Sequence, residues 1–130
     1  MADIYDVYGY PVSEQMPIGW SAEKLVAVVN EDDGFGDKNF SGKVLVNTPT
    51  IEVRLLNFRA GQQTPYEKAG YDLSLFVTEG SGNLALGYED IELSKSLVVV
   101  VPKGLLWGVK NSGNGNLTII QNINKNQYLN

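Results

Sequence analysis

Short runs of β-branched and apolar residues follow one another from about residue 40 to about residue 123, and Gly, Pro, Asn or Ser separates each run from the next. No long helical pattern and no internal repeat interrupts this succession. Many short strands joined by glycine-rich turns predict an all-β sandwich or barrel. The predicted strands cover residues 44–47, 51–58, 72–79, 83–88, 97–101, 107–110 and 117–123.

Alternation along residues 51–58 predicts which side chains face the core. Ile51, Val53 and Leu55 form a fully apolar face, which we expect to point inward. Arg54 then lies on the opposite face beside Glu52, where a surface ion pair is the expected arrangement. The alternative is that Arg54 points into the barrel and holds a carboxylate or phosphate group.

Two other runs give less certain patterns. Residues 97–101 are uniformly apolar and precede Pro102, so we expect a strand that is buried on both faces. Residues 21–29 could form a short helix or a strand, and the β-branched residues at their end favour a strand.

Length and composition indicate one domain that spans residues 1–130. The chain is 43% hydrophobic and 19% charged, as is usual for a soluble globular protein. Residues 1–20 carry many aromatic rings and form an N-terminal arm that we expect to pack on a barrel edge or on a second subunit. Residues 40–123 form the barrel region and residues 124–130 a polar tail, with boundaries accurate to about four positions.

The residue types that are absent exclude several kinds of chemistry. The chain has no Cys and no His, so it has no thiolate, no cysteine-bound metal and no catalytic imidazole. Its net charge of -5 and its lack of any basic run argue against nucleic-acid binding. The start of the chain lacks the basic flank and apolar run of a secretion signal, and no apolar run is long enough to span a membrane. We therefore expect a cytoplasmic protein that contacts neither nucleic acid nor membrane.

The segment from Gly61 to Gly80 has the spacing of a metal-binding segment. Glu67, Ala69 and Leu73 occupy the spaced positions between the two glycines. Of these three residues, only Glu67 carries an atom that can bind a metal ion.

A second segment begins at Ser96 and contains Pro102, Gly104, Trp107 and Asn111. In order and spacing, the two segments together resemble the two sequence motifs of the cupin superfamily. Pro102, Gly104 and Asn111 match the second motif, whereas Ser96 replaces its first glycine and Trp107 replaces its histidine. The resemblance implies a cupin-type jelly-roll β-barrel.

The same resemblance implies that the usual metal site has been lost. In metal-bearing cupins, three His and one Glu inside the barrel hold the ion, and the equivalent positions here are Glu67, Ala69, Leu73 and Trp107. Ala69 and Leu73 have no donor atom, and an indole offers only an N–H group. One carboxylate cannot hold a transition metal, because such sites need three or four ligands. We therefore expect no metal and no cofactor.

By the resemblance, these four side chains point into the barrel, which makes its interior mostly apolar with one ring and one acid. Such a lining is typical of a small-molecule site. Alternation from Leu73 places Leu75 and Val77 inward too. Thr64 is expected near the barrel wall, and Tyr66, Tyr71, Gln62 and Gln63 are expected to line its mouth. The expected ligand-binding residues are Thr64, Tyr66, Ala69, Leu73, Trp107 and Gln63.

Glu67 and Trp107 each allow two interpretations. Glu67 is either a general acid or base, with Tyr71 as a second proton-transferring group, or a rim carboxylate paired with Lys68, Arg54 or Arg59. Trp107 is either a stacking platform for a ligand, or a ring that fills the space of the lost ligands with its N–H bonded to a carbonyl. The second interpretation is favoured in both cases.

Three functions remain compatible with these residues. The first is metal-free binding of a small organic ligand, a carbohydrate or a carboxylate-like compound, in the barrel. The second is a metal-independent isomerase, epimerase or lyase that uses Glu67 as acid or base. The third is an assembly role with the barrel closed by Trp107 and Leu73. Cupins commonly pair through an N-terminal strand and one sheet, so the resemblance also implies a homodimer.

Overall fold

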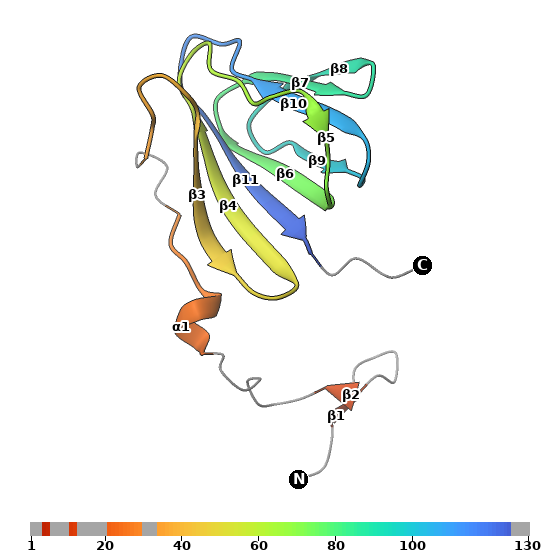
Figure 1. Cartoon of the computed structure of the whole chain (residues 1–130). Coiled ribbons are helices and arrows are strands. Elements are labelled where there is room, and N and C mark those ends of the chain that lie inside the picture. The colour runs from red at the N-terminus through yellow and green to blue at the C-terminus, as the bar shows by residue number, and fades with distance from the viewer. Residues whose placement is uncertain (1–3, 6–10, 13–20, 30–33, 126–130) are drawn as a thin grey trace.

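The computed structural model describes residues 4–5, 11–12, 21–29 and 34–125. Strands β3 to β11 form two antiparallel sheets that face each other and enclose the core (Figure 1). The four-stranded sheet has the order β5 (Glu67–Lys68), β10 (Leu106–Lys110), β7 (Gly82–Leu86) and β8 (Glu89–Leu93). The five-stranded sheet has the order β3 (Ser41–Asn47), β4 (Ile51–Phe58), β11 (Leu117–Asn124), β6 (Asp72–Glu79) and β9 (Val98–Val101).

The all-β fold predicted from the sequence is confirmed by this arrangement. Every strand predicted between residues 44 and 123 is present, with boundaries that shift by up to three residues. Of the barrel strands, β5 and β8 were not predicted, because β5 is only two charged residues long and β8 carries acids at its exposed positions.

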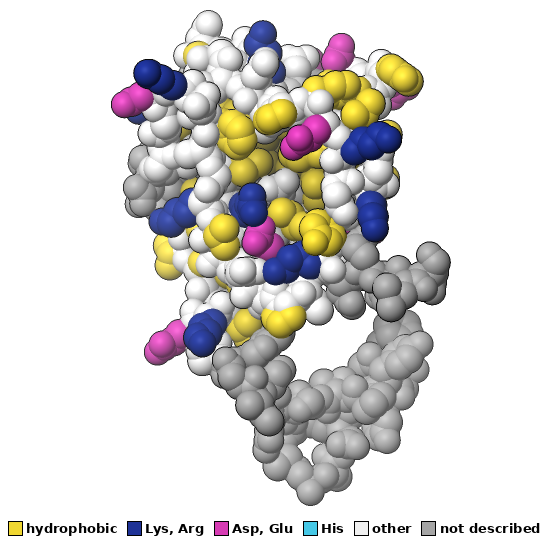
Figure 2. All heavy atoms as spheres, in the orientation of Figure 1, with side chains coloured by type: hydrophobic (Ala, Val, Ile, Leu, Met, Phe, Trp, Pro, Cys, Tyr) yellow, Lys and Arg dark blue, Asp and Glu magenta, His cyan; other side chains and the backbone are white. Residues whose placement is uncertain are grey.

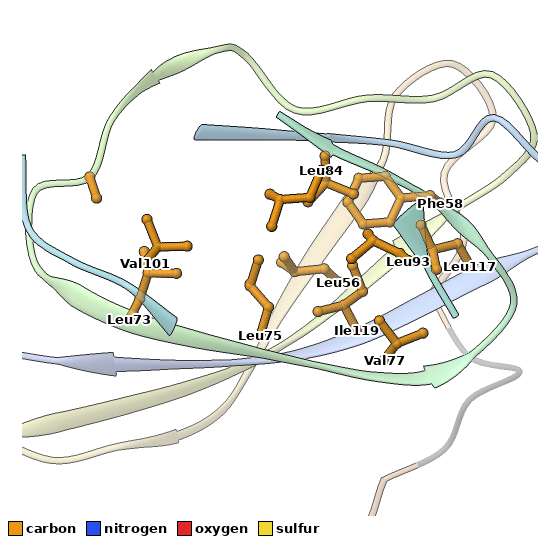
Figure 3. Close-up of a cluster of buried hydrophobic side chains, with 12 residues drawn as sticks. Leu56, Phe58, Leu73, Leu75, Val77, Leu84, Leu93, Val101, Leu117 and Ile119 are labelled. Atoms are coloured by element: carbon orange, nitrogen blue, oxygen red, sulfur yellow. The ribbon is translucent and has the colours of Figure 1, made fainter. Parts of the chain in front are cut away.

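The core lies between the two sheets. Strand alternation brings Leu73, Leu75 and Val77 of β6 inward, as predicted. In Figure 3, side chains of the five-stranded sheet point toward Leu84 of β7 and Leu93 of β8. The cluster is fully apolar, so hydrophobic burial supplies the main force that holds the sheets together.

The predicted inner face of β4 is wrong. Leu56 and Phe58 belong to the core cluster, and Phe58 stacks on Phe40 with ring centroids 5.1 Å apart. Arg54 and Glu52 share the face of Leu56, so they also point inward, while Ile51 is 48% exposed. Alternation alone could not choose the face, because both faces of this strand carry buried leucines.

The prediction for residues 97–101 is wrong as well. Strand β9 lies at the edge of the five-stranded sheet, and among the described strands it pairs only with β6. Val98 and Val100 are 59% and 63% exposed, whereas Val101 is fully buried. The strand is therefore buried on one face, because nothing in the described part of the chain covers the other.

The described part of the N-terminal region differs from the strand expected there. Residues 22–25 form the short helix α1 (Ala22–Leu25), which lies outside the barrel (Figure 1), and residues 26–29 are exposed and irregular. Strands β1 (Ile4–Tyr5) and β2 (Pro11–Val12) pair with each other. The rest of the predicted N-terminal arm, and residues 126–130 of the predicted tail, lie outside the described residues. Within the described ranges, no helix combines the length and the hydropathy needed to cross a bilayer.

Candidate functional site

A pocket of about 310 Å³ lies between β4 and β11 of the five-stranded sheet and β5 and β10 of the four-stranded sheet, and we call it the mouth pocket. Figure 2 shows hydrophobic side chains gathered in a hollow of the face turned to the viewer, with acidic and basic side chains around it. The mouth pocket joins residues from both halves of the barrel. It is lined by Phe40, Gly42, Arg54, Leu56, Thr64, Pro65, Glu67, Trp107 and Gln121.

Arg54 and Gln121 form one wall of the mouth pocket. They are directly paired across β4 and β11, so their side chains lie next to each other on the inner face. Gln121 is only 6% exposed. Among the described residues, none makes a hydrogen bond with its side-chain amide. Its amide group is therefore available inside the pocket.

Arg54 is anchored by Glu52 of the same strand. Its Nε donates to Oε2 of Glu52 at 2.6 Å, and the side chains of Arg54 and Glu52 are 42% and 13% exposed. This contact uses one edge of the guanidinium group. The two terminal nitrogens have no acceptor in the described part of the chain, so their N–H groups can serve a ligand.

Glu67 and Trp107 form the opposite wall. They are directly paired across β5 and β10, and both line the mouth pocket. Glu67 is an exposed residue at the rim, whereas Trp107 is half-buried and packs on the core cluster. Neither the expected ion pair of Glu67 with Lys68, Arg54 or Arg59 nor the expected hydrogen bond from the Trp107 indole occurs among the described residues.

Thr64 fixes the chain that leads into this wall. Its backbone N–H donates to the Val109 carbonyl at 2.8 Å, and its Oγ1 accepts the Val109 N–H at 2.9 Å. Two bonds to one residue of β10 hold the segment before β5 against the four-stranded sheet. Thr64 thus lines the mouth pocket, as predicted, from a fixed position.

No protein-family model and no curated protein matches the sequence. Among solved structures, an RmlC-like cupin family protein of Methanocaldococcus jannaschii with a double-stranded β-helix fold shares 19% identity at a TM-score of 0.66, over 76% of this chain and 88% of its own. An RmlC-like cupin protein of Desulfovibrio desulfuricans shares 22% identity at a TM-score of 0.63, over 71% of this chain and 88% of its own. The chain has the cupin fold.

Within this cupin barrel, the four residues at the positions that resemble cupin metal ligands do not all line one pocket. Glu67 and Trp107 line the mouth pocket. Ala69 is 4% exposed and Leu73 is 7% exposed, and both belong to the core cluster. Among the described residues, no three His, Cys, Asp or Glu side chains gather into a group that could hold a metal ion. The donor set of the cupin metal site does not fit an ion here, because Glu67 supplies its only oxygen ligands.

The remaining predicted site residues lie elsewhere on the cupin barrel. Gln63 and Tyr66 line a separate pocket of about 370 Å³ over the outer face of β7 and β10, and the Tyr66 hydroxyl donates to the Gly87 carbonyl. Leu73 also lines a pocket of about 520 Å³ at the far end of the five-stranded sheet. Tyr71 is 43% exposed and lines none of the three pockets described here.

Gln62, expected at the mouth, is a structural residue instead. It is 8% exposed, its Oε1 accepts the Arg59 N–H at 2.7 Å, and its Nε2 donates to the Gly36 carbonyl at 3.0 Å. These bonds tie the start of the first motif to the loop before β3.

Two polar residues of the mouth pocket were not expected there. For Arg54, the inward position was only the alternative to a surface ion pair with Glu52, and Gln121 was not singled out. The signal for Gln121 was present, since it continues the inward alternation of Leu117 and Ile119 along β11. A glutamine in line with two core residues marks the point where the core gives way to a polar lining.

Proposed function

We propose that this protein binds a small organic ligand, a carbohydrate or a carboxylate-like compound, in the mouth pocket of its cupin barrel. The observation that carries the proposal is Gln121, a 6% exposed amide that lines the pocket without a hydrogen-bond partner in the described part of the chain. With no partner in the described chain, the amide atoms are open to the pocket, since no buried side-chain nitrogen or oxygen among the described residues lacks a hydrogen-bond partner. A hydrogen bond from this amide to a ligand contributes about 0.5–1.5 kcal/mol.

The rest of the lining supports the same function. Trp107, Phe40 and Leu56 supply apolar and aromatic surface, while Arg54 and Glu67 supply charged hydrogen-bonding groups. Small-molecule sites combine a mostly apolar wall with a few placed polar groups in this way. The pocket reaches Glu67 and is open, which disfavours an assembly role with a closed barrel.

Binding accounts for these residues better than turnover does. A metal-independent isomerase, epimerase or lyase needs a second proton-transferring group near Glu67. Tyr71 does not line the mouth pocket, and the Tyr66 hydroxyl is bonded to the Gly87 carbonyl in a different pocket. Glu67 is thus a contact residue in this proposal.

The test uses the fluorescence of Trp107. Trp20 is the other tryptophan in the chain, so the Trp20→Phe variant leaves Trp107 as the single indole. We expect members of a library of neutral sugars, carboxylates, amines and amino acids to change this fluorescence and to raise the melting temperature, because a ligand that binds only the folded state stabilises it. A library that at millimolar concentration changes neither signal would rule out the proposal.

A matched pair of variants locates the binding. Replacing Gln121 with Leu should weaken the affinity of the best library compound by about ten-fold, since it removes the buried hydrogen bonds. The adjacent Asn122 is exposed and points to the opposite face of β11. Asn122→Leu should leave the affinity unchanged, and equal effects of the two variants would contradict the assigned site.

A further inference from the structure

Building on that proposed function, we propose that the ligand of the mouth pocket is a free α-amino acid. Its carboxylate is held by Arg54 and Gln121, and its ammonium group is held by Glu67 and Trp107. Each wall of the pocket consists of a directly paired charged and uncharged residue, and the two charges have opposite signs.

The Arg54 wall is suited to a carboxylate. The Nε of Arg54 is occupied by Glu52 at 2.6 Å, which fixes the plane of the guanidinium group and leaves its terminal nitrogens for a ligand. Charge-assisted bonds of this kind are about twice as strong as neutral ones. The neighbouring Gln121 amide adds a donor that no described residue uses.

The Glu67 wall is suited to an ammonium group. Glu67 has no cationic partner among the described residues, and its neighbour Trp107 presents an indole ring in the same pocket. An ammonium ion placed there gains a carboxylate contact and a cation–π contact together.

The charges of the pocket disfavour a simple anion. The lining and its anchor contain one guanidinium group, Arg54, and two carboxylates, Glu52 and Glu67. A ligand that carries only a carboxylate adds a third negative group to this set. A zwitterion has no net charge and therefore adds no net negative charge to the pocket. A neutral sugar forms hydrogen bonds but leaves the opposed charges of the two walls without partners.

The size and the apolar part of the lining indicate a small ligand with an apolar side chain. The pocket volume of about 310 Å³ is at the lower end of the usual range of about 300–1,000 Å³. Phe40, Leu56 and Pro65 supply the apolar surface beside the charged groups. L-leucine is therefore the probe of choice.

The experiment compares L-leucine with three probes, in calorimetric titrations of the full chain. 4-Methylpentanoate lacks the ammonium group, 3-methylbutylamine lacks the carboxylate, and D-glucose is a neutral polyol. We expect leucine to bind about ten-fold more tightly than each of the others, because each analogue loses a charge-assisted contact. If glucose or either leucine analogue binds more tightly than leucine, the amino-acid assignment is wrong. It is also wrong if none of the four compounds binds. The library screen at Trp107 separately decides whether the pocket binds any small organic ligand.

Two variants assign the groups. Glu67→Gln should abolish the preference for leucine over 4-methylpentanoate, and Arg54→Gln should abolish the preference for leucine over 3-methylbutylamine. Glu89 and Arg59 do not line the mouth pocket, so Glu89→Gln and Arg59→Gln are the matched controls and should keep both preferences. Because Arg54→Gln leaves Glu52 without its partner, the double variant with Glu52→Gln is measured as well. Preferences that survive Glu67→Gln or the double variant contradict the assignment.

Discussion

Single residues of the two cupin motifs keep structural roles that need no metal. Asn111 is fully buried, and its side-chain Nδ2 donates to the carbonyls of Phe58 at 2.9 Å and Gly115 at 2.7 Å. Its own carbonyl accepts the Gly61 N–H at 2.8 Å, so the two motifs are joined by a backbone hydrogen bond. Such contacts hold the barrel together whatever occupies its interior. This explains how Gly61 and Asn111 can match the motifs while the ligand positions do not.

Gly61 and Gly80 stand at the two ends of the first motif, and alanine substitutions at them test how tightly each glycine is packed. Both have positive φ values, of 84° and 87°. A Cβ at Gly61 would meet no atom within 4 Å, whereas a Cβ at Gly80 would lie 2.1 Å from the Asn116 carbonyl oxygen. Gly61→Ala should lower the free energy of unfolding by about 1 kcal/mol for the left-handed conformation alone. Gly80→Ala should lower the free energy of unfolding by at least about 2 kcal/mol more than Gly61→Ala, because the backbone at Asn116 must move to make room for the Cβ.

Urea denaturation of the two alanine variants measures this difference. The φ values are nearly the same, so the comparison isolates the steric contact with the chain at Asn116. Equal losses of stability would contradict the close packing at Gly80.

At the scale of elements, position within the sheet decides which strand faces are buried. β9 has the most apolar sequence of all the strands, yet it lies at an edge and exposes every second valine. β4 is paired on both sides, and its inner face changes from apolar at Phe58 to charged at Glu52 as it reaches the open side of the barrel. The mouth pocket lies on this transition.

Strand β9 yields a prediction with an internal control. Val101 is fully buried and Val100 is 63% exposed. Val101→Thr should lower the free energy of unfolding by about 2 kcal/mol, because it buries a hydroxyl group in an apolar core. Val100→Thr should change it by less than about 0.5 kcal/mol. Chemical denaturation checks both values, and a large loss at Val100 would show that this face is covered.

At the scale of the whole molecule, the cupin fold brings together residues that are distant in sequence. Arg54 and Gln121 come from β4 and β11, whereas Glu67 and Trp107 come from β5 and β10. The two sheets place these pairs on opposite walls of one pocket. The opposed charges on which the amino-acid proposal rests are therefore a property of the closed barrel and of no single strand.

The homodimer stays a prediction, because most of the N-terminal arm lies outside the described residues. We expect light scattering at micromolar concentration to give a mass of twice the 14.2 kDa chain. A dilution series serves as the control, since a weak dimer dissociates as the concentration falls. A species of 14.2 kDa throughout the series would contradict the prediction.

The sequence by itself determined the class of fold, the positions of most strands and which donor atoms stand at the four positions that resemble cupin metal ligands. Period-two alternation and turn residues are local signals, and donor atoms are fixed by residue type. Only the tertiary structure decided that Arg54 points inward, that β9 is an edge strand and that Gln121 completes the mouth pocket. These facts depend on which strand lies beside which, and strand neighbours such as β4 and β11 are set by long-range pairing that no local pattern records.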